Sequence, residues 1–195
     1  LNEAFGFGED RRVKVTPTAL PEVLLIEPRV FPDSRGHFFE SWVGPRYQEA
    51  GITAPFVQDN FSRSTQNTLR GLHFQEPKGQ GKLITVLSGK IYDVVVDVRS
   101  DSPRYREWIG IQLDGDDPKQ LWIPPGFAHG FCVLSEQADF MYKCTEFYTP
   151  ETERSIRWDD PELAIDWPLD APILSEKDAA APYLANAPVL PRMST

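Results

Sequence analysis

Cysteine is nearly absent from this sequence of 195 residues, which contains only Cys132 and Cys144. Two cysteines cannot build the multi-bridge framework that stabilises small secreted folds. We expect two reduced thiols in the core, and the alternative is a single disulfide between neighbouring strands of a hairpin. The cysteine content therefore argues against a disulfide-dense extracellular domain.

Long hydrophobic runs and positive charge are also scarce. No stretch approaches the ~20 apolar residues that a membrane-spanning helix needs, and residues 1–16 lack the apolar core of a signal peptide. The 20 Lys and Arg residues stand against 29 Asp and Glu, which gives a net charge of -9. Such a balance argues against a nucleic-acid or anionic-membrane surface. We therefore expect a cytoplasmic protein with neither nucleic acid nor membrane as a partner.

Helix-breaking residues, by contrast, are plentiful: there are 18 prolines and 13 glycines, together with 12 phenylalanines. With 41% hydrophobic residues the chain can bury a core, and this mixture favours many short strands over a helical bundle. The length suits one domain, residues 1–195. We treat residues 1–20 as an arm that either adds an edge strand or reaches a partner subunit, and residues 179–195 as a tail.

Strand-like segments follow one another at close spacing, and one short helix is predicted at 46–50. The predicted strands are 22–31, 37–42, 56–62, 68–75, 82–87, 90–99, 107–113, 120–123, 128–135 and 140–148. This number of short strands, separated by Gly and Pro turns, is typical of a sandwich or small barrel. Alternation in the strand at 90–99 puts Asp93 and Asp97 on one face, which must be either solvated or functional.

Several familiar site motifs are missing or incomplete. There is no G-x-S-x-G nucleophile elbow, and neither His-x-Glu nor Cys-x-x-Cys zinc patterns occur. The Gly-x-Gly pairs at 6–8 and 79–81 each lack a glycine that a dinucleotide or phosphate loop requires. A metal site on the three scattered histidines is disfavoured, because Gly71 and Gln75 flank His73 where a His-x-His pair is needed.

Two histidines stand in suggestive surroundings. His73 shares a strand-like segment with Arg70, although a single histidine is more often a surface or core residue than a catalytic one. His129 follows the turn Pro124-Pro-Gly at the start of a strand. Either it lies at the mouth of a barrel, or it caps the turn by hydrogen bonding.

Seven motifs, taken in order, resemble the dTDP-4-dehydrorhamnose 3,5-epimerase family over residues 21–182. They are Phe56-Val-Gln-Asp-Asn, Leu69-Arg-Gly-Leu-His-Phe-Gln, Gln80-Gly-Lys-Leu, Tyr92-Asp-Val-Val-Val-Asp-Val-Arg, Leu121-Trp-Ile-Pro-Pro-Gly-Phe-Ala-His-Gly-Phe, Tyr142-Lys and Leu174-Ser-Glu-Lys-Asp. The resemblance implies an all-β, jelly-roll (cupin-like) double-sheet barrel with a few short helices. It also implies a homodimer without a metal or organic cofactor. The family's reaction inverts C3 and C5 of dTDP-4-dehydro-6-deoxy-D-glucose, which gives dTDP-4-dehydro-L-rhamnose.

The resemblance assigns a catalytic role to four residues. His73 is the base, Asp178 is its carboxylate partner, Lys82 lies beside the ketone oxygen and Tyr142 donates a proton from the other face. These residue types suit the chemistry, because a base with a near-neutral pKa can remove a proton next to a ketone while a cation stabilises the enolate. Without the resemblance, each of the last three would be an ordinary surface or core residue.

The resemblance also implies a set of substrate-binding residues. Arg35 and Arg70 match arginines that bind the diphosphate, and Phe147 matches an aromatic residue that stacks on thymine. Strict alternation would put Arg70 and His73 on opposite faces of their strand, unless Gly71 marks a bulge. The other matching positions are Glu40, Gln58 and Asn60 for the nucleotide, with Asp93 and His129 as a second carboxylate–imidazole pair in the pocket.

Other functions compete with the double epimerase. The nearest is a 3- or 5-monoepimerase that acts in a dTDP-deoxysugar pathway for a natural product. A 3,4-ketoisomerase of similar fold matches the motifs less well, and a non-catalytic sugar-nucleotide-binding barrel would not need the four catalytic residues. The nearly complete motif set favours the 3,5-epimerase.

Overall fold

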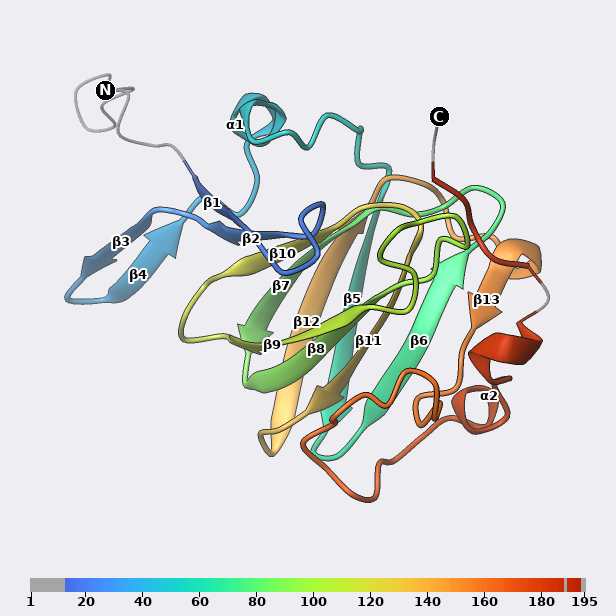
Figure 1. The fold of residues 1–195 in the computed structure, drawn as a ribbon. Coiled ribbons are helices and arrows are strands. Elements are labelled where there is room, and N and C mark those ends of the chain that lie inside the picture. Colours follow the sequence, from blue (N-terminus) through green and yellow to red (C-terminus); the bar gives the residue numbers. More distant parts are fainter. Residues whose placement is uncertain (1–12, 188, 194–195) are drawn as a thin grey trace.

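The structure, a computed structural model, describes residues 13–187 and 189–193 and consists mostly of β-strands (Figure 1). A six-stranded sheet has the order β1-β2-β10-β7-β12-β5 and a five-stranded sheet the order β13-β6-β11-β8-β9, while β3 and β4 form a separate hairpin. The strands are β1 (Lys14–Pro17), β2 (Leu24–Glu27), β3 (Val30–Asp33), β4 (Gly36–Phe39), β5 (Gln58–Thr65), β6 (Leu69–Gln75), β7 (Lys82–Ser88), β8 (Lys90–Asp97), β9 (Trp108–Asp114), β10 (Gln120–Ile123), β11 (Phe127–Val133), β12 (Gln137–Cys144) and β13 (Glu153–Ser155).

Helical structure in the described residues is short. The α-helices are α1 (Gly44–Glu49) and α2 (Glu176–Ala179), and single 3₁₀ turns occur at Pro150–Thr152 and Leu184–Asn186. None of these helices is long and apolar enough to cross a membrane. Pro45 stands in the first turn of α1, where the missing N–H of proline costs no intrahelical hydrogen bond.

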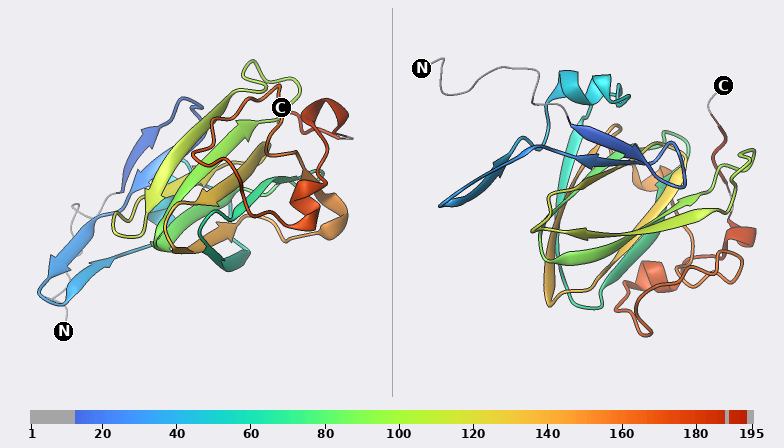
Figure 2. Two further views of the ribbon diagram at one scale, coloured as in Figure 1. Left: turned by 90° about the horizontal axis from the view of Figure 1, so that it is seen from below. Right: turned by 60° about the vertical axis from the view of Figure 1, so that its left-hand side comes forward.

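The two large sheets face each other and enclose the main core (Figures 1 and 2). This core includes Ile84, Val95, Phe131 and Phe140, all nearly inaccessible to solvent. Each such side chain contributes about 1.5–3 kcal/mol through burial. A second cluster, which includes Val94 and Leu184, fills the outer face of the five-stranded sheet beneath the C-terminal segment. A third, smaller cluster lies between α1 and the outer face of the six-stranded sheet.

Strand β8 is consequently buried on both faces. Val94 and Val96 point toward the outer cluster, whereas Ile91 and Val95 point between the sheets. Asp93 and Asp97 share that inward face and are fully buried. The face that carries the two acids is therefore not solvated.

The double-sheet, mostly β architecture agrees with the sequence prediction, but closure into a barrel does not. Hydrogen-bonded pairing ends at β1 and β5 in one sheet and at β9 and β13 in the other, so within the described residues no strand joins the two sheets into a closed cylinder. Cys132 and Cys144 are both buried and are not bonded to each other, which confirms the prediction of two reduced thiols in the core.

Individual strands differ from the prediction where local chemistry interrupts them. The segment 22–31 splits into β2 and β3 at Pro28, which has no N–H for the ladder. The arm supplies edge strand β1, which pairs with β2 over Lys14–Pro17, while residues 1–12 lie outside the described part. Strand β13 was not predicted, because three residues carry no readable periodicity.

Candidate active site

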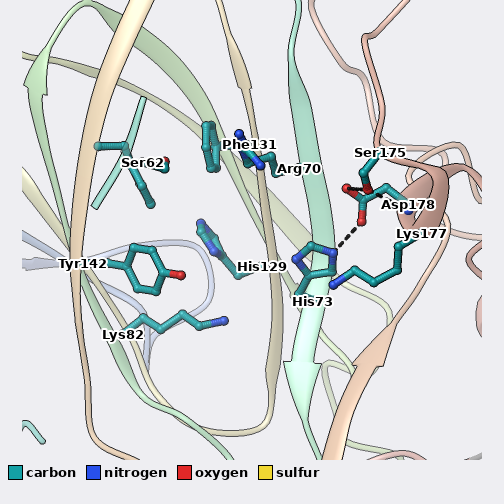
Figure 3. Close-up of a pocket in the computed structure, with 11 residues that line it drawn as sticks. Ser62, Arg70, His73, Lys82, His129, Phe131, Tyr142, Ser175, Lys177 and Asp178 are labelled. Carbon is teal, nitrogen blue, oxygen red and sulfur yellow. Dashed lines mark hydrogen bonds and ion pairs between the residues drawn. The ribbon is translucent and has the colours of Figure 1, made fainter. Parts of the chain in front are cut away.

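A cavity of about 260 Å³ lies between the sheets, and all four of the predicted catalytic residues line it (Figure 3). Its volume falls below the range of about 300–1,000 Å³ that is usual for whole drug-sized ligands. The cavity therefore suits a single sugar ring better than a complete nucleotide sugar. Its lining residues are Ser62, Arg70, His73, Lys82, His129, Phe131, Phe140, Tyr142, Ser175, Lys177 and Asp178.

His73 and Asp178 form a hydrogen-bonded pair although they are 105 residues apart in the sequence. His73 comes from β6, and its Nε2 lies 2.6 Å from Oδ1 of the buried Asp178 in α2. Ser175 caps α2: its Oγ accepts from the Asp178 backbone N–H at 3.1 Å and donates to Asp178 Oδ2 at 2.9 Å. This local capping holds the carboxylate in the position in which it contacts the histidine.

The environment of Asp178 determines the tautomer of His73. Burial acts to raise the pKa of the Asp178 carboxyl, but hydrogen bonds from His73 and Ser175 outweigh it and leave the pKa below its usual value. The ionised carboxylate can only accept, so Nε2 of His73 carries the proton. The other ring nitrogen points into the cavity (Figure 3) and is free to accept a proton.

Lys82 and Tyr142 reach the cavity from the opposite sheet. In the ladder between β12 and β7, Tyr142 pairs with Ile84 and Cys144 pairs with Lys82, so the two functional side chains share the inward face. Burial raises the pKa of Tyr142 to about 12, which keeps the phenol protonated and able to donate. Burial also lowers the pKa of the Lys82 ammonium, and nearby Cys144 and Asp93 act in the opposite direction.

A second carboxylate–imidazole pair lies beside the first. His129 in β11 is paired with His73 in β6, so both imidazoles lie on the inward face. Nε2 of His129 is 2.9 Å from Oδ2 of Asp93, and both residues are buried. Burial raises the pKa of Asp93, although His129 and Lys82 act to lower it.

A bulge in β6 brings Arg70 and His73 to the same face. Between the pairs His129–His73 and Phe131–Arg70 the ladder advances two residues on β11 and three on β6. Gly71 has a φ of +130°, and a Cβ there would lie 2.5 Å from the Cα of Gly130. The glycine therefore permits the irregularity that the sequence suggested, and Arg70 lines the cavity.

The predicted nucleotide-binding residues lie outside the cavity lining. Gln58 and Asn60 occupy the inward face of β5, where the Gln58 amide donates to Asn60 Oδ1 at 2.9 Å. Phe147 follows the end of β12 and is 59% exposed. Arg35 and Glu40 lie in and just after the β3–β4 hairpin, which projects away from the two sheets (Figures 1 and 2). Arg35 is paired with Asp33, and Glu40 with Arg46.

Sequence reasoning missed five cavity residues. Ser175 and Lys177 belong to the Leu174–Asp178 motif, so their place beside Asp178 could have been inferred from it. Ser62, Phe131 and Phe140 gave no signal, because a serine and two aromatic residues in strands are ordinary. In the structure the rings of Phe131 and Phe140 stack with centroids 4.6 Å apart and form one wall of the cavity.

The site thus combines two imidazole–carboxylate pairs, a buried ammonium and a neutral phenol. No group of three or more His, Cys, Asp or Glu side chains among the described residues is placed to hold a metal ion. The dTDP-4-dehydrorhamnose 3,5-epimerase family matches residues 17–186. The chain belongs to this family.

Members of the epimerase family resemble this chain over nearly its whole length. A dTDP-4-dehydrorhamnose 3,5-epimerase of Pseudomonas aeruginosa is 53% identical over 181 residues, which cover 92% of this chain and 100% of that protein. The dTDP-6-deoxy-D-glucose-3,5-epimerase of Legionella pneumophila, solved with dTDP-4-keto-L-rhamnose, has a TM-score of 0.91 at 51% identity and covers 94% of this chain and 100% of its own.

The same fold also serves a related epimerisation. A 3′-monoepimerase of Streptomyces bikiniensis, solved with dTDP-quinovose, has a TM-score of 0.82 at 34% identity, with 87% of each chain covered. These relatives are epimerases, which are isomerases.

Proposed function

We propose that this chain is a dTDP-4-dehydrorhamnose 3,5-epimerase that converts dTDP-4-dehydro-6-deoxy-D-glucose to dTDP-4-dehydro-L-rhamnose. The observation that carries the proposal is the placement of a base and an acid on opposite sides of one cavity. His73 comes from the five-stranded sheet and Tyr142 from the six-stranded sheet, and their functional groups face each other across the cavity (Figure 3).

Each inversion needs one proton removed and another delivered. The free nitrogen of His73 takes the proton from the carbon next to the ketone, and the C–H electron pair moves onto the ketone oxygen as an enolate. The Lys82 ammonium stabilises this negative charge. The electrons then return to form a C–H bond with the Tyr142 hydroxyl proton on the opposite face, which inverts the centre. Exchange with solvent restores both groups, and the sequence repeats at the second carbon.

The remaining predicted residues would bind the part of the substrate outside the cavity. We assign the diphosphate to Arg70 and Arg35, because guanidinium groups form bidentate contacts with phosphate. Gln58, Asn60 and Glu40 are assigned to the nucleotide and Phe147 to stacking on thymine. His129 completes the sugar pocket, with Asp93 as its carboxylate partner. These steps and contacts use side chains alone and assign no role to a metal or an organic cofactor.

We further infer a homodimer of jelly-roll subunits. The edge strands β1 and β5 leave unpaired backbone groups that a second copy can cover. In the β3–β4 hairpin, Phe38 is exposed, and Arg35 is not among the residues that line the cavity of its own subunit. A second subunit would give this hairpin a cavity to reach, so that Arg35 and Glu40 of one chain serve the site of the other.

The test is NMR of dTDP-4-dehydro-6-deoxy-D-glucose with the purified protein in D2O. A 3,5-epimerase incorporates deuterium at both C3 and C5 and yields the L-rhamno product. Inversion at one centre alone would establish the monoepimerase activity that the Streptomyces relative represents. Binding of the sugar nucleotide without any exchange would overturn catalysis and leave a binding protein.

A further inference from the structure

One hydroxyl at the cavity has no partner within the described protein. Among the described residues, three buried side-chain polar atoms lack a hydrogen bond: Ser62 Oγ, Asp93 Oδ1 and Arg154 Nε. Of these three residues only Ser62 lines the cavity. Ser64, two residues along the same face of β5, differs because its Oγ accepts from Arg70 Nε at 3.1 Å. Since native proteins pair nearly all buried polar groups, the Ser62 hydroxyl calls for a partner that the chain does not supply.

Ser62 occupies the end of the cavity away from Lys82. On β5, Ser62 pairs with Phe140, whereas Gln58 pairs with Cys144 and Cys144 in turn pairs with Lys82. Four residues of strand separate these positions, roughly 13 Å along the sheet. Figure 3 shows Ser62 on the side of Phe131 and Arg70, with Tyr142 and His129 between it and Lys82.

The chemistry of the sugar selects one candidate partner. If the C4 ketone lies at Lys82, the C1–C2 edge of the ring points to the opposite end, where Ser62 and Arg70 lie. The C3 hydroxyl changes position during the reaction, C4 carries the ketone and C5 carries a methyl group. Of the two hydroxyl groups on the ring, only the C2 hydroxyl keeps its configuration from substrate to product, so it can keep the same hydrogen bond throughout the reaction.

We propose that Ser62 binds the C2 hydroxyl of the sugar and makes the enzyme selective for 2-hydroxy over 2-deoxy sugar nucleotides. This inference rests on the proposed epimerase function. The contact anchors the ring at a centre that does not react, while C3 and C5 exchange protons with His73 and Tyr142. Arg70, held in place by Ser64, would bind the diphosphate attached to the neighbouring C1.

The test compares Ser62→Ala with the wild type on two substrates, dTDP-4-dehydro-6-deoxy-D-glucose and its 2-deoxy analogue, with deuterium incorporation at C5 as the readout. We expect the wild type to prefer the 2-hydroxy substrate about five- to tenfold in kcat/KM, the usual effect of one neutral hydrogen bond. Ser62→Ala should lose that preference through a slower reaction with the natural substrate alone. Thr65→Ala, which removes an exposed hydroxyl from the same strand, should keep the wild-type preference.

The outcomes separate the two proposals. A wild type that leaves the natural substrate unchanged would overturn both. If the wild type is active and Ser62→Ala shows the same substrate preference, the C2 contact alone is overturned. The C2 contact is also overturned if Ser62→Ala binds dTDP, which has no sugar at this position, more weakly than the wild type does. Ser62→Cys keeps the size of the side chain but not a strong hydrogen bond, so it should reproduce the loss of preference even if Ser62→Ala folds poorly.

Discussion

At the scale of single residues, the two sides of the cavity carry groups that suit the opposite proton transfers of the proposed mechanism. Asp178 keeps the proton of His73 on Nε2, which leaves the other ring nitrogen, the proposed base, facing the cavity. Tyr142 is held neutral by burial, with a pKa raised to about 12. Because the base and the acid come from different sheets, removal of either should have a different effect on exchange and on inversion.

Tyr142→Phe should therefore slow inversion while deuterium exchange continues, whereas His73→Ala should abolish both. With Tyr142→Phe, His73 still removes and returns protons on one face, so deuterium enters the sugar with configuration retained. Inversion should slow by about 10²–10⁴, the usual contribution of a positioned general acid. NMR in D2O measures both quantities at once. Wild-type inversion in Tyr142→Phe, or wild-type exchange in His73→Ala, would contradict the assignment.

The Lys82 ammonium makes the rate sensitive to alkaline pH. In the proposed mechanism only the charged form stabilises the enolate. Because burial lowers the pKa of Lys82, activity should fall at a pH below the ordinary lysine value of about 10.4. Tyr142, with its pKa of about 12, ionises above this limb. Asp93 acts to raise the pKa of Lys82, so Asp93→Asn should move the fall in kcat to still lower pH. Lys90→Met, at an exposed lysine, should leave the profile unchanged.

The pairing of His73 with Asp178 shows what residue patterns alone could not reveal. Nothing in alternation or spacing connects two residues that are 105 positions apart. The ordered motifs of a known family suggested the pair, and the structure brings the two side chains together. Ser62, in contrast, could not be predicted from the sequence, because only the structure shows that its hydroxyl lacks a hydrogen-bond partner.

At the scale of elements, the bulge in β6 is the device that aligns the site. The extra residue puts Arg70 and His73 on one face, and the close contact of Gly71 with Gly130 leaves no room for a side chain. Gly71→Ala must relieve both a clash at 2.5 Å and an unfavourable φ of +130°. We expect a loss of at least about 2 kcal/mol in the free energy of unfolding.

Denaturant unfolding of Gly71→Ala would measure this cost, with Gly44→Ala as the matched control. Gly44 begins α1, and a Cβ there meets nothing within 4 Å. Its substitution should be neutral or slightly stabilising. Equal stability of the two variants would show that β6 accommodates the side chain and that the bulge does not depend on glycine.

Most strands could be predicted because period-two alternation and Gly or Pro turns survive in the sequence. Strand β10 occupies the predicted residues 120–123, whereas β12 begins at Gln137 and ends at Cys144, ahead of the predicted 140–148. The difference follows from the partner strand: β12 pairs with β5 from Gln137–Thr65 to Cys144–Gln58, and such pairing is not visible in a single strand. Helix α2 is only four residues long and has Ser175 as its N-cap, so it is too short to be predicted from helical periodicity.

At the scale of the whole molecule, the position of Arg35 raises the question of which cavity it serves. Its side chain is 87% exposed on a hairpin that projects from its own subunit, and its ion pair with Asp33 contributes little at such exposure. If the homodimer forms as proposed, light scattering should give about twice the chain mass of 22.1 kDa. A mass of one chain at micromolar concentration would contradict the dimer and the shared site with it.

Mixing two inactive variants would then show whether the hairpin acts across the dimer. We expect Arg35→Ala and His73→Ala each to be severely impaired alone. In a mixed dimer, the subunit with an intact His73 faces a partner with an intact Arg35, so one of its two sites regains every group. Random exchange of subunits makes half of the dimers mixed, and about a quarter of the wild-type activity should return. If Arg35 serves its own subunit, that same site lacks the arginine and mixing restores nothing.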